Sequence, residues 1–296
     1  MRVSDGYVRA ETVDEAVAAL QSCKDGDAFV LAGGTIIGSL INQKLLAPSL
    51  IVDISRIDEL RRIKRSLGGG LLIGALATHH DVRRSAEIRS ACPLMSEIAD
   101  EISCDRLRNR GTVGGSLCSV GQQGDTAVGL LAAAAMIHIQ GPGGSRTVAM
   151  EDFYSDTFST VLESGELVTK VEILPLPKVA KWAFSKIGPR KAMDFTLISV
   201  AVMLTCDARR KSIDTIRLAV SGASDTATRL TATERMLVGS NPEELEWDVV
   251  EATVDKEISP QGDLVFSEDY KRHVCAVVIR RTVERAWSKV DVRGEM

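Results

Sequence analysis

The stretch 104-CDRLRNRGTVGGSLCSVGQQGD-125 decides how this chain is understood, because a double glycine, three arginines and two aspartates fall within one short segment. One residue separates the pair Gly114-Gly115 from a threonine on its N-terminal side, and a serine directly follows the pair. A second double glycine stands upstream in 31-LAGGTIIG-38, after an apolar run and beside a threonine. Glycine lets a backbone approach a pyrophosphate, and exposed N–H groups neutralise an anion without a cation. We therefore interpret the two pairs as backbone segments that close on one diphosphate.

The sequence around the first pair predicts a β-α-β unit. The apolar run 28-AFVLA-32 ends at the glycines, 36-IIGSLINQKLL-46 has helical spacing, and 50-LIVDIS-55 is a strand. Two common phosphate motifs are absent, since no Gly-Lys-Ser/Thr occurs and the spacing is not G-x-G-x-x-G. Taken singly, each pair is either an anion cradle or a tight turn into a helix. Both interpretations stay open for each pair.

Composition argues against several classes of protein. The 296 residues are 45% hydrophobic and 26% charged with a net charge of −4, which allows a large core and shows no basic bias toward nucleic acid. Aromatic residues are only 4%, too few for base-stacking platforms. The N-terminus has no apolar signal core and no run is long enough for a membrane span, so we expect a cytoplasmic protein. The six cysteines include no C-x-x-C pair, and we expect neither an iron–sulfur nor a structural zinc site.

The remainder of the chain predicts a change of structure near its middle. The apolar 126-TAVGLLAAAAMIHIQG-141 has a helical first half and an alternating, strand-like end, and we place a domain boundary around 175-PLPK-178. Beyond the boundary, three segments alternate like antiparallel strands, at 181–187, 196–207 and 213–224. From residue 228 onward helices dominate, at 231–239, 242–256 and 268–290, and we expect a frayed tail at 291–296.

With these segments assembled, the sequence resembles a known family. AGGTIIGSLIN, LLIGALATHHDV, RNRGTVGGSLC followed by GD, and FSKIGPRKAMDFTLISVAV are similar to the flavoprotein (medium) subunit of molybdenum-containing hydroxylases. That family includes carbon monoxide dehydrogenase, xanthine dehydrogenase and related aldehyde and aromatic oxidoreductases. The resemblance covers nearly the whole chain in order. The set of motifs is specific, although no single motif is.

The resemblance implies an α+β fold in two parts. Residues 1–176 would form a two-subdomain FAD-binding domain of the vanillyl-alcohol-oxidase (PCMH) type, with subdomains of about 1–56 and 57–176 and FAD held between them. Residues 177–296 would form the flavoprotein C-terminal domain, a three-stranded antiparallel sheet with a helical bundle.

The resemblance also implies how FAD is held. Residues 30–37 would wrap the diphosphate and pass under the flavin, and residues 112–116 would form the second diphosphate segment. Asp125 would hold ribityl or ribose hydroxyls, and Lys186 would reach the N1/C2=O edge of the flavin, where a cation raises the flavin potential. The implied cofactor-binding residues are Val30, Leu31, Ala32, Gly33, Gly34, Thr35, Ile36, Ile37, Ile102, Thr112, Gly114, Gly115, Ser116, Asp125, Val168 and Lys186. No catalytic or metal-binding residue is implied on this chain.

The implied function is electron transfer. A partner large subunit would carry molybdopterin and the substrate site, and a partner small subunit would carry two [2Fe–2S] clusters, in a dimer of heterotrimers. FAD on this chain would pass electrons to an external acceptor such as NAD, a quinone or O2. The alternatives are a self-contained FAD-dependent oxidoreductase with its own substrate pocket and a flavin-less scaffold subunit. The scaffold alternative arises because Ser116 stands where many relatives have Asn, and 119-SVGQQGD-125 stands where they have a Pro-containing segment.

Several residues allow a structural interpretation beside a functional one. His79 and His80 are metal ligands or, as we favour, the first turn of a helix capped by Thr78. Arg108 and Arg110 contact phosphate or, in the second interpretation, anchor the loop or face solvent. Lys186 without the resemblance would be a solvated surface residue. Arg190, Lys191 and Asp194 predict an ion-pair turn, with support of the flavin pocket as the second interpretation.

Overall fold

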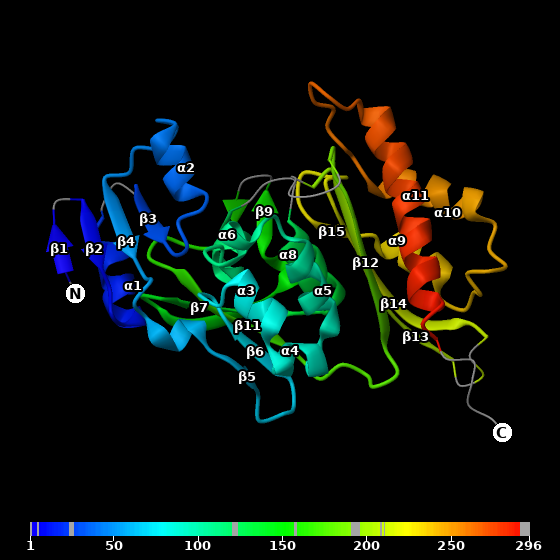
Figure 1. Ribbon diagram of the computed structural model, residues 1–296, viewed down its shortest axis with the longest axis horizontal. Helices are drawn as coiled ribbons and strands as arrows, with labels where there is room; N and C mark the ends of the chain where they lie inside the picture. Colours follow the sequence, from blue (N-terminus) through cyan, green and yellow to red (C-terminus); the bar gives the residue numbers. More distant parts are fainter. Residues whose placement is uncertain are drawn as a thin grey trace.

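Three blocks lie side by side along the long axis of the molecule (Figure 1). We call residues 2–54 the N-terminal block, residues 57–173 the middle block and residues 181–290 the C-terminal block. The computed structural model describes residues 2–4, 6–23, 27–119, 124–156, 159–190, 196–207, 209 and 211–290. Within these residues no helix is long and apolar enough to cross a membrane.

The N-terminal block is a mixed four-stranded sheet in the order β1-β2-β4-β3. Both β2 and β3 run parallel to the central strand β4, as the predicted β-α-β unit requires. Thr12 caps α1 by accepting a hydrogen bond from the N–H of Glu15. The elements are β1 (Arg2–Ser4), β2 (Tyr7–Arg9), α1 (Val13–Ser22), β3 (Ala28–Leu31), α2 (Ile37–Asn42) and β4 (Leu50–Asp53).

The middle block packs helices on a five-stranded antiparallel sheet in the order β5-β6-β11-β7-β8. Its first half contains η1 (Asp58–Arg61), β5 (Ile63–Arg65), β6 (Leu71–Gly74), α3 (His79–Arg84), α4 (Ala86–Ala91), α5 (Pro93–Glu101) and α6 (Asp105–Arg108). Its second half contains α7 (Val113–Cys118), α8 (Asp125–Ala132), β7 (Met136–Gly141), β8 (Gly144–Ala149), η2 (Met150–Asp152), β9 (Tyr154–Asp156), β10 (Ser159–Thr160) and β11 (Leu167–Ile173).

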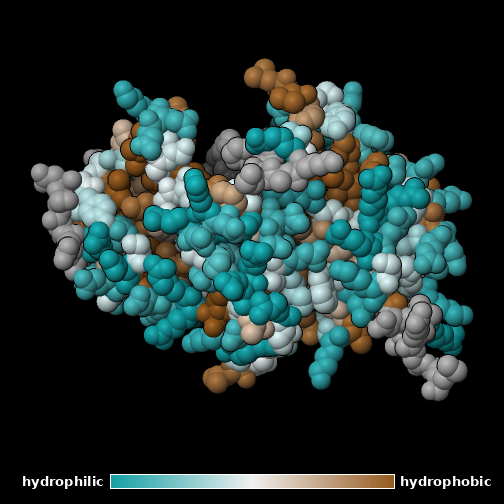
Figure 2. Space-filling view, in the orientation of Figure 1, coloured by the Kyte–Doolittle hydropathy of each residue, from teal (hydrophilic) through white to brown (hydrophobic). Residues whose placement is uncertain are grey.

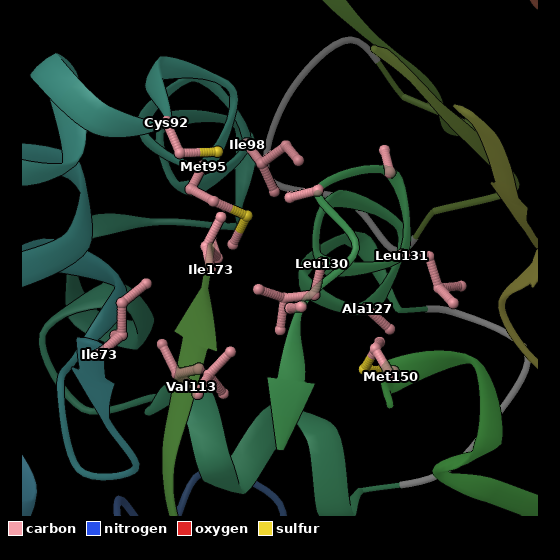
Figure 3. Close-up of a cluster of buried hydrophobic side chains, with 14 of the residues drawn as sticks. Ile73, Cys92, Met95, Ile98, Val113, Ala127, Leu130, Leu131, Met150 and Ile173 are labelled. Atoms are coloured by element: carbon pink, nitrogen blue, oxygen red, sulfur yellow. The ribbon is translucent and has the colours of Figure 1, made fainter. Parts of the chain in front are cut away.

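The core of the middle block lies between this sheet and its helices (Figure 3). Ile73 and Ile173 of the sheet belong to the same buried cluster as Met95 and Ile98 of α5, and Ile173 lies beside Met95 in the close-up (Figure 3). Helix α8 is buried over residues 126–132 because α5 covers one side of it and strands β13 and β14 of the C-terminal block cover another. This helix therefore joins two blocks.

The C-terminal block is an antiparallel sheet in the order β12-β13-β14-β15 with three helices. Its elements are β12 (Lys181–Ile187), β13 (Ile198–Cys206), β14 (Ile213–Ser221), β15 (Thr228–Arg229), α9 (Thr231–Leu237), α10 (Trp247–Glu257) and α11 (Glu268–Trp287). Helix α11 packs on β12 and β13, while α8 of the middle block packs on β13 and β14 (Figure 1). The sheet is thus covered on both faces.

The predicted fold class is confirmed, with differences in detail. The C-terminal sheet has a short fourth strand, β15, beyond the three predicted. Strand β13 does not alternate as expected, since residues 198–205 are all buried, and the helices on both faces of the sheet explain why. Helix α2 is shorter than predicted and ends at Asn42, where Lys44 turns left-handed with a φ of 58°. The predicted tail lies outside the described residues.

An ion-pair network also joins the middle and C-terminal blocks. Glu151 in η2 accepts from Arg217 of β14 at 2.5 Å and from Arg229 of β15 at 2.8 Å. Arg217 also donates through Nε to the backbone oxygen of Leu131 at 3.0 Å. The network ties both strands to η2, and β14 also to the end of helix α8, and so fixes the C-terminal sheet against the middle block.

We expect Gly222→Ala to destabilise the chain more than Gly69→Ala does. Both glycines have positive φ, 82° and 83°, so each substitution carries a left-handed strain of about 1–2 kcal/mol. A Cβ on Gly222 would lie 1.9 Å from the backbone oxygen of Leu197, whereas a Cβ on Gly69 meets nothing within 4 Å. Overpacking adds about 1–3 kcal/mol at Gly222 alone. Urea unfolding of both variants measures the difference, and equal losses would contradict it.

Candidate cofactor-binding site

Two adjoining cavities form one cleft where the three blocks meet. The first has a volume of about 570 Å³ and is lined by residues from all three blocks, including Ser39 of α2, His79 of α3 and Lys186 of β12. The second has a volume of about 690 Å³ and lies between the N-terminal and middle blocks. Both cavities share Thr35, Ile36, Leu40, Ser116 and Ser119. The space-filling view shows the molecular outline hollowed beside α2, on the side facing the C-terminal block (Figure 2).

The first glycine pair forms a turn between β3 and α2 that offers unpaired backbone donors. Among the described residues, the backbone N–H groups of residues 34–37 donate no hydrogen bond. Gly34 has a φ of 73°, which favours glycine at this position. Thr35 and Ile36 of this turn line both cavities. Unpaired backbone N–H groups gathered in one turn are the kind of donors that bind an anion in other proteins.

Arg110 holds this turn in place from the second segment. Its guanidinium donates from Nε and Nη2 to the backbone oxygen of Gly33, both at 3.1 Å. A Cβ on Gly33 would lie 1.8 Å from the backbone oxygen of Arg110, so only glycine allows the two segments to approach this closely. Arg108 instead donates to the backbone oxygens of residues 100, 102 and 103. Both arginines anchor the loop here, as one of the two interpretations predicted.

The second glycine pair lies in the short helix α7 and differs from the first. Thr112 caps the helix and accepts from the N–H of Gly115 at 3.1 Å. The N–H groups of Val113 and Gly114 donate to the backbone oxygens of Ala77 and Ala75. These amides are therefore paired within the protein, and the segment offers a ligand mainly the hydroxyl of Ser116.

Gly114 serves close packing, because a Cβ there would lie 2.7 Å from the Cβ of Ala75. Substituting Gly33 or Gly114 would thus disturb the protein before it touched any ligand. The sequence left an anion cradle or a tight turn open for each pair, and at these two glycines the structure shows close packing of neighbouring segments. Only tertiary contacts separate a glycine that admits a ligand from one that admits a neighbouring backbone.

Asp125 forms the charged wall of the first cavity. Its Oδ2 is 2.7 Å from Lys186 Nζ and its Oδ1 accepts from Thr196 Oγ1 at 2.8 Å. Lys186 also donates to the backbone oxygen of Glu101 at 3.2 Å. The side chains of Lys186 and Asp125 are 13% and 8% exposed, so the interpretation of Lys186 as a solvated surface residue is wrong. Two residues of the C-terminal block thus hold a carboxylate of the middle block.

His79 is a second ionisable group in the first cavity. It is 4% exposed, and Nε2 lies 2.8 Å from the hydroxyl oxygen of Ser116. Burial lowers its pKa from 6.5 to about 4, with Asp125 opposing this shift and Arg108 adding to it. His79 begins helix α3, which Thr78 caps as predicted. The imidazole is therefore neutral at neutral pH.

Most of the predicted site residues come together in this cleft. All of them except Leu31 line one cavity or the other, with Ile102 in the first and Val168 in the second. His79 and Thr196 were missed as site residues: His79 was assigned to a helix turn, and nothing in the sequence distinguishes Thr196 from other strand threonines.

Arg190 has an interaction partner. Lys191 and Asp194, predicted to join it in an ion-pair turn, lie outside the described residues.

A turn with unpaired N–H groups at the junction of two large cavities suits the class of proteins that bind an extended dinucleotide cofactor. Comparison with known proteins makes the class specific. The family described as the FAD binding domain in molybdopterin dehydrogenase matches residues 2–177. The CO dehydrogenase flavoprotein C-terminal domain matches residues 183–286.

Similar proteins agree over nearly the full length. The chain is 34% identical to the glyceraldehyde dehydrogenase medium chain of Sulfolobus acidocaldarius, over 92% of this chain and 94% of that protein. It is 30% identical to the carbon monoxide dehydrogenase medium chain of Hydrogenophaga pseudoflava, over 96% and 97%. A solved structure of carbon monoxide dehydrogenase from that organism superposes with a TM-score of 0.91 at 28% identity, covering 97% and 99%.

The chain therefore belongs to the FAD-binding medium subunits of the molybdenum hydroxylases, as the sequence resemblance indicated. FAD is its cofactor, and the chain is a subunit of an oxidoreductase.

We expect acid to destabilise the chain partly through His79. Between pH 6.5 and about 4 the unfolded chain binds a proton on this residue that the folded chain does not. The free energy of unfolding therefore decreases as the pH is lowered through this range. From pH 7 to 4.5 this contribution is about 2–3 kcal/mol. His79→Gln should lose it, whereas His273→Gln, at an exposed position, should not. Urea unfolding at both pH values tests this. If His79→Gln loses as much unfolding free energy between pH 7 and 4.5 as the unsubstituted chain does, the prediction is wrong.

Proposed function

We propose that this chain passes electrons from the [2Fe–2S] clusters of its small partner subunit, through FAD, to an external acceptor. A molybdopterin-binding large subunit would oxidise the substrate, and the complex would be a dimer of heterotrimers. The observation that carries the proposal is the pairing of every ionisable side chain described in the first cavity. Asp125 and Lys186 bind each other, and neutral His79 is bound to Ser116.

This pairing argues against a self-contained oxidoreductase. A general base for an organic substrate needs a pKa near the working pH and an atom free to take the proton. Both oxygens of Asp125 already accept hydrogen bonds, and the pKa of His79 is about 4. The described lining of the first cavity therefore suits a bound cofactor better than proton abstraction.

The placement of FAD that we propose follows the charges of the cleft. The diphosphate would lie at the junction of the cavities, where the free N–H groups of residues 34–37 and the Ser116 hydroxyl face it. The flavin would occupy the first cavity, beside Lys186 and Ile102. The adenosine would occupy the second, which is lined largely by apolar residues such as Phe29, Leu162 and Val168. This distribution argues against a scaffold that has lost its flavin.

The residues of this chain bind and orient the cofactor. FAD, when bound, supplies a redox centre that can exchange electrons with iron–sulfur clusters and with a two-electron acceptor. The turn at residues 34–37 neutralises the diphosphate, and Lys186 places a cation, balanced by Asp125, in the flavin cavity. The acceptor, whether NAD, a quinone or O2, would approach the open side of the cleft. We also propose a cytoplasmic location, in keeping with six cysteines that form no disulfide among them.

Reduction experiments on the separate and assembled proteins test the electron-transfer role. We expect the FAD of the purified chain to remain oxidised when aldehydes, purines or CO are added under anaerobic conditions. Adding the small and large subunits with their own substrate should bleach the flavin absorbance. Bleaching of the isolated chain by an organic substrate would instead establish the self-contained oxidoreductase, and a chain purified from the assembled complex without flavin would establish the scaffold.

We expect substitutions of the Asp125–Lys186 pair to move the FAD midpoint potential in opposite directions. Lys186→Met removes the cation and leaves the carboxylate, which should lower the potential by about 20–45 mV, from about 1–2 kcal/mol of lost interaction. Asp125→Asn leaves the cation unbalanced and should raise it. Lys186→Arg keeps the charge and should change it little. Spectroelectrochemical titration measures all three, and shifts of the same sign in the first two would refute the proposed flavin position.

A further inference from the structure

His79 and Ser116 form a pair in the cleft that helix capping does not explain. The ring atom Nε2 of His79 lies 2.8 Å from Ser116 Oγ. The cap of helix α3 uses Thr78 and Asp81, so the His79 side chain is not needed for it. Although His79 is only 4% exposed, its side chain lines the first cavity, and its Nδ1 has no hydrogen-bond partner among the described residues. The imidazole is thus buried and aimed into the site.

The backbone fixes the two residues relative to each other. The N–H of His79 donates to the backbone oxygen of Gly111 at 3.0 Å, and Thr78 forms a β-bridge with Thr112. Ser116 lies one helical turn after Thr112 and donates its N–H to that residue at 2.9 Å. The imidazole packs against Gly111, where an added Cβ would lie 3.1 Å from Cδ2. The 2.8 Å contact is therefore built by the fold.

Only one proton arrangement of this pair suits an anion. Ser116 has one hydroxyl proton, and a neutral imidazole has one N–H. If Nε2 were the acceptor, the hydroxyl would donate to His79 and turn its lone pairs toward the cleft. If Nε2–H is the donor, the hydroxyl proton is free. Ser116 lines both cavities, as do Thr35 and Ile36 of the turn with free N–H groups.

We propose that His79 is a positioning residue whose Nε2–H donates to Ser116 Oγ and so leaves the Ser116 hydroxyl proton for the FAD diphosphate. The inference rests on the diphosphate position given under the proposed function. His79 acts through Ser116 and needs no contact with FAD. Its burial keeps the imidazole neutral, so Nδ1 bears a lone pair in this arrangement, and the pair directs one donor, the hydroxyl, at the anion.

The test is a double-mutant cycle on FAD affinity, measured by the fluorescence change when the deflavinated chain takes up FAD. A hydrogen bond to a charged group corresponds to roughly 10–100-fold in affinity, which is the loss expected for Ser116→Ala. His79→Phe keeps a planar ring without the donor, and its FAD affinity should fall by most of the factor expected for Ser116→Ala. The double variant should bind as Ser116→Ala does. His79→Gln, whose amide N–H reaches the place of Nε2, should restore binding.

Two fragments of the cofactor locate the effect. Affinity for ADP, which carries the diphosphate without a flavin, should weaken in His79→Phe as it does for FAD, whereas riboflavin should be unaffected. If the affinity losses of the two single variants multiply in the double variant, or if His79→Phe weakens only riboflavin binding, the role of His79 is overturned. If Ser116→Ala leaves the FAD and ADP affinities unchanged, the diphosphate lies elsewhere and the proposed placement fails as well. Electron transfer from the partner subunits is measured separately and stands or falls by itself.

Discussion

The buried carboxylate of Asp125 is the constraint on which the site depends. An ionised side chain with 8% exposure is strongly unfavourable unless it is paired and hydrogen-bonded. Both partners, Lys186 and Thr196, come from the C-terminal block, while Asp125 begins helix α8 of the middle block. The first cavity is therefore complete only when the C-terminal sheet is docked. The apolar packing of α8 on β13 and β14 and the ion pairs of Glu151 hold that docking in place.

The two glycine pairs have different physical tasks although they look alike in sequence. The first forms a turn whose amides stay unpaired, and Arg110 binds its carbonyl oxygen to fix it. The second lies in a capped helix whose first amides pair with residues 75 and 77, and its glycine allows the helix to touch β6 and the residues after it. The first pair lines the second cavity, and the second pair brings Ser116 to both cavities. The approach of the two segments, with Gly33 against Arg110, unites them in one cleft.

The electrostatics of the cleft match a subunit that binds a cofactor and leaves substrate chemistry to its partners. Lysine and aspartate neutralise each other beside the proposed flavin position, and burial holds a histidine neutral. Such groups can shift a potential or orient a donor without exchanging protons with an organic molecule. Relatives named as medium chains of carbon monoxide and glyceraldehyde dehydrogenases share this fold over nearly their full length, although the substrates in their names differ. A common electron-transfer role would account for that conservation of architecture.

The sequence by itself determined the order of the elements, because apolar periodicity is a local property of the chain. The resemblance carried by its motifs indicated the family and the cofactor. Tertiary structure alone decided which amides remain free, since Val113 and Gly114 are paired by residues far upstream. It also decided that β13 is buried on both faces and that His79 meets Ser116. Lys186 and Asp125, 61 residues apart, meet only when the blocks pack together. Pairing, burial and pKa depend on neighbours that are distant in sequence, and a single sequence does not say which residues those are.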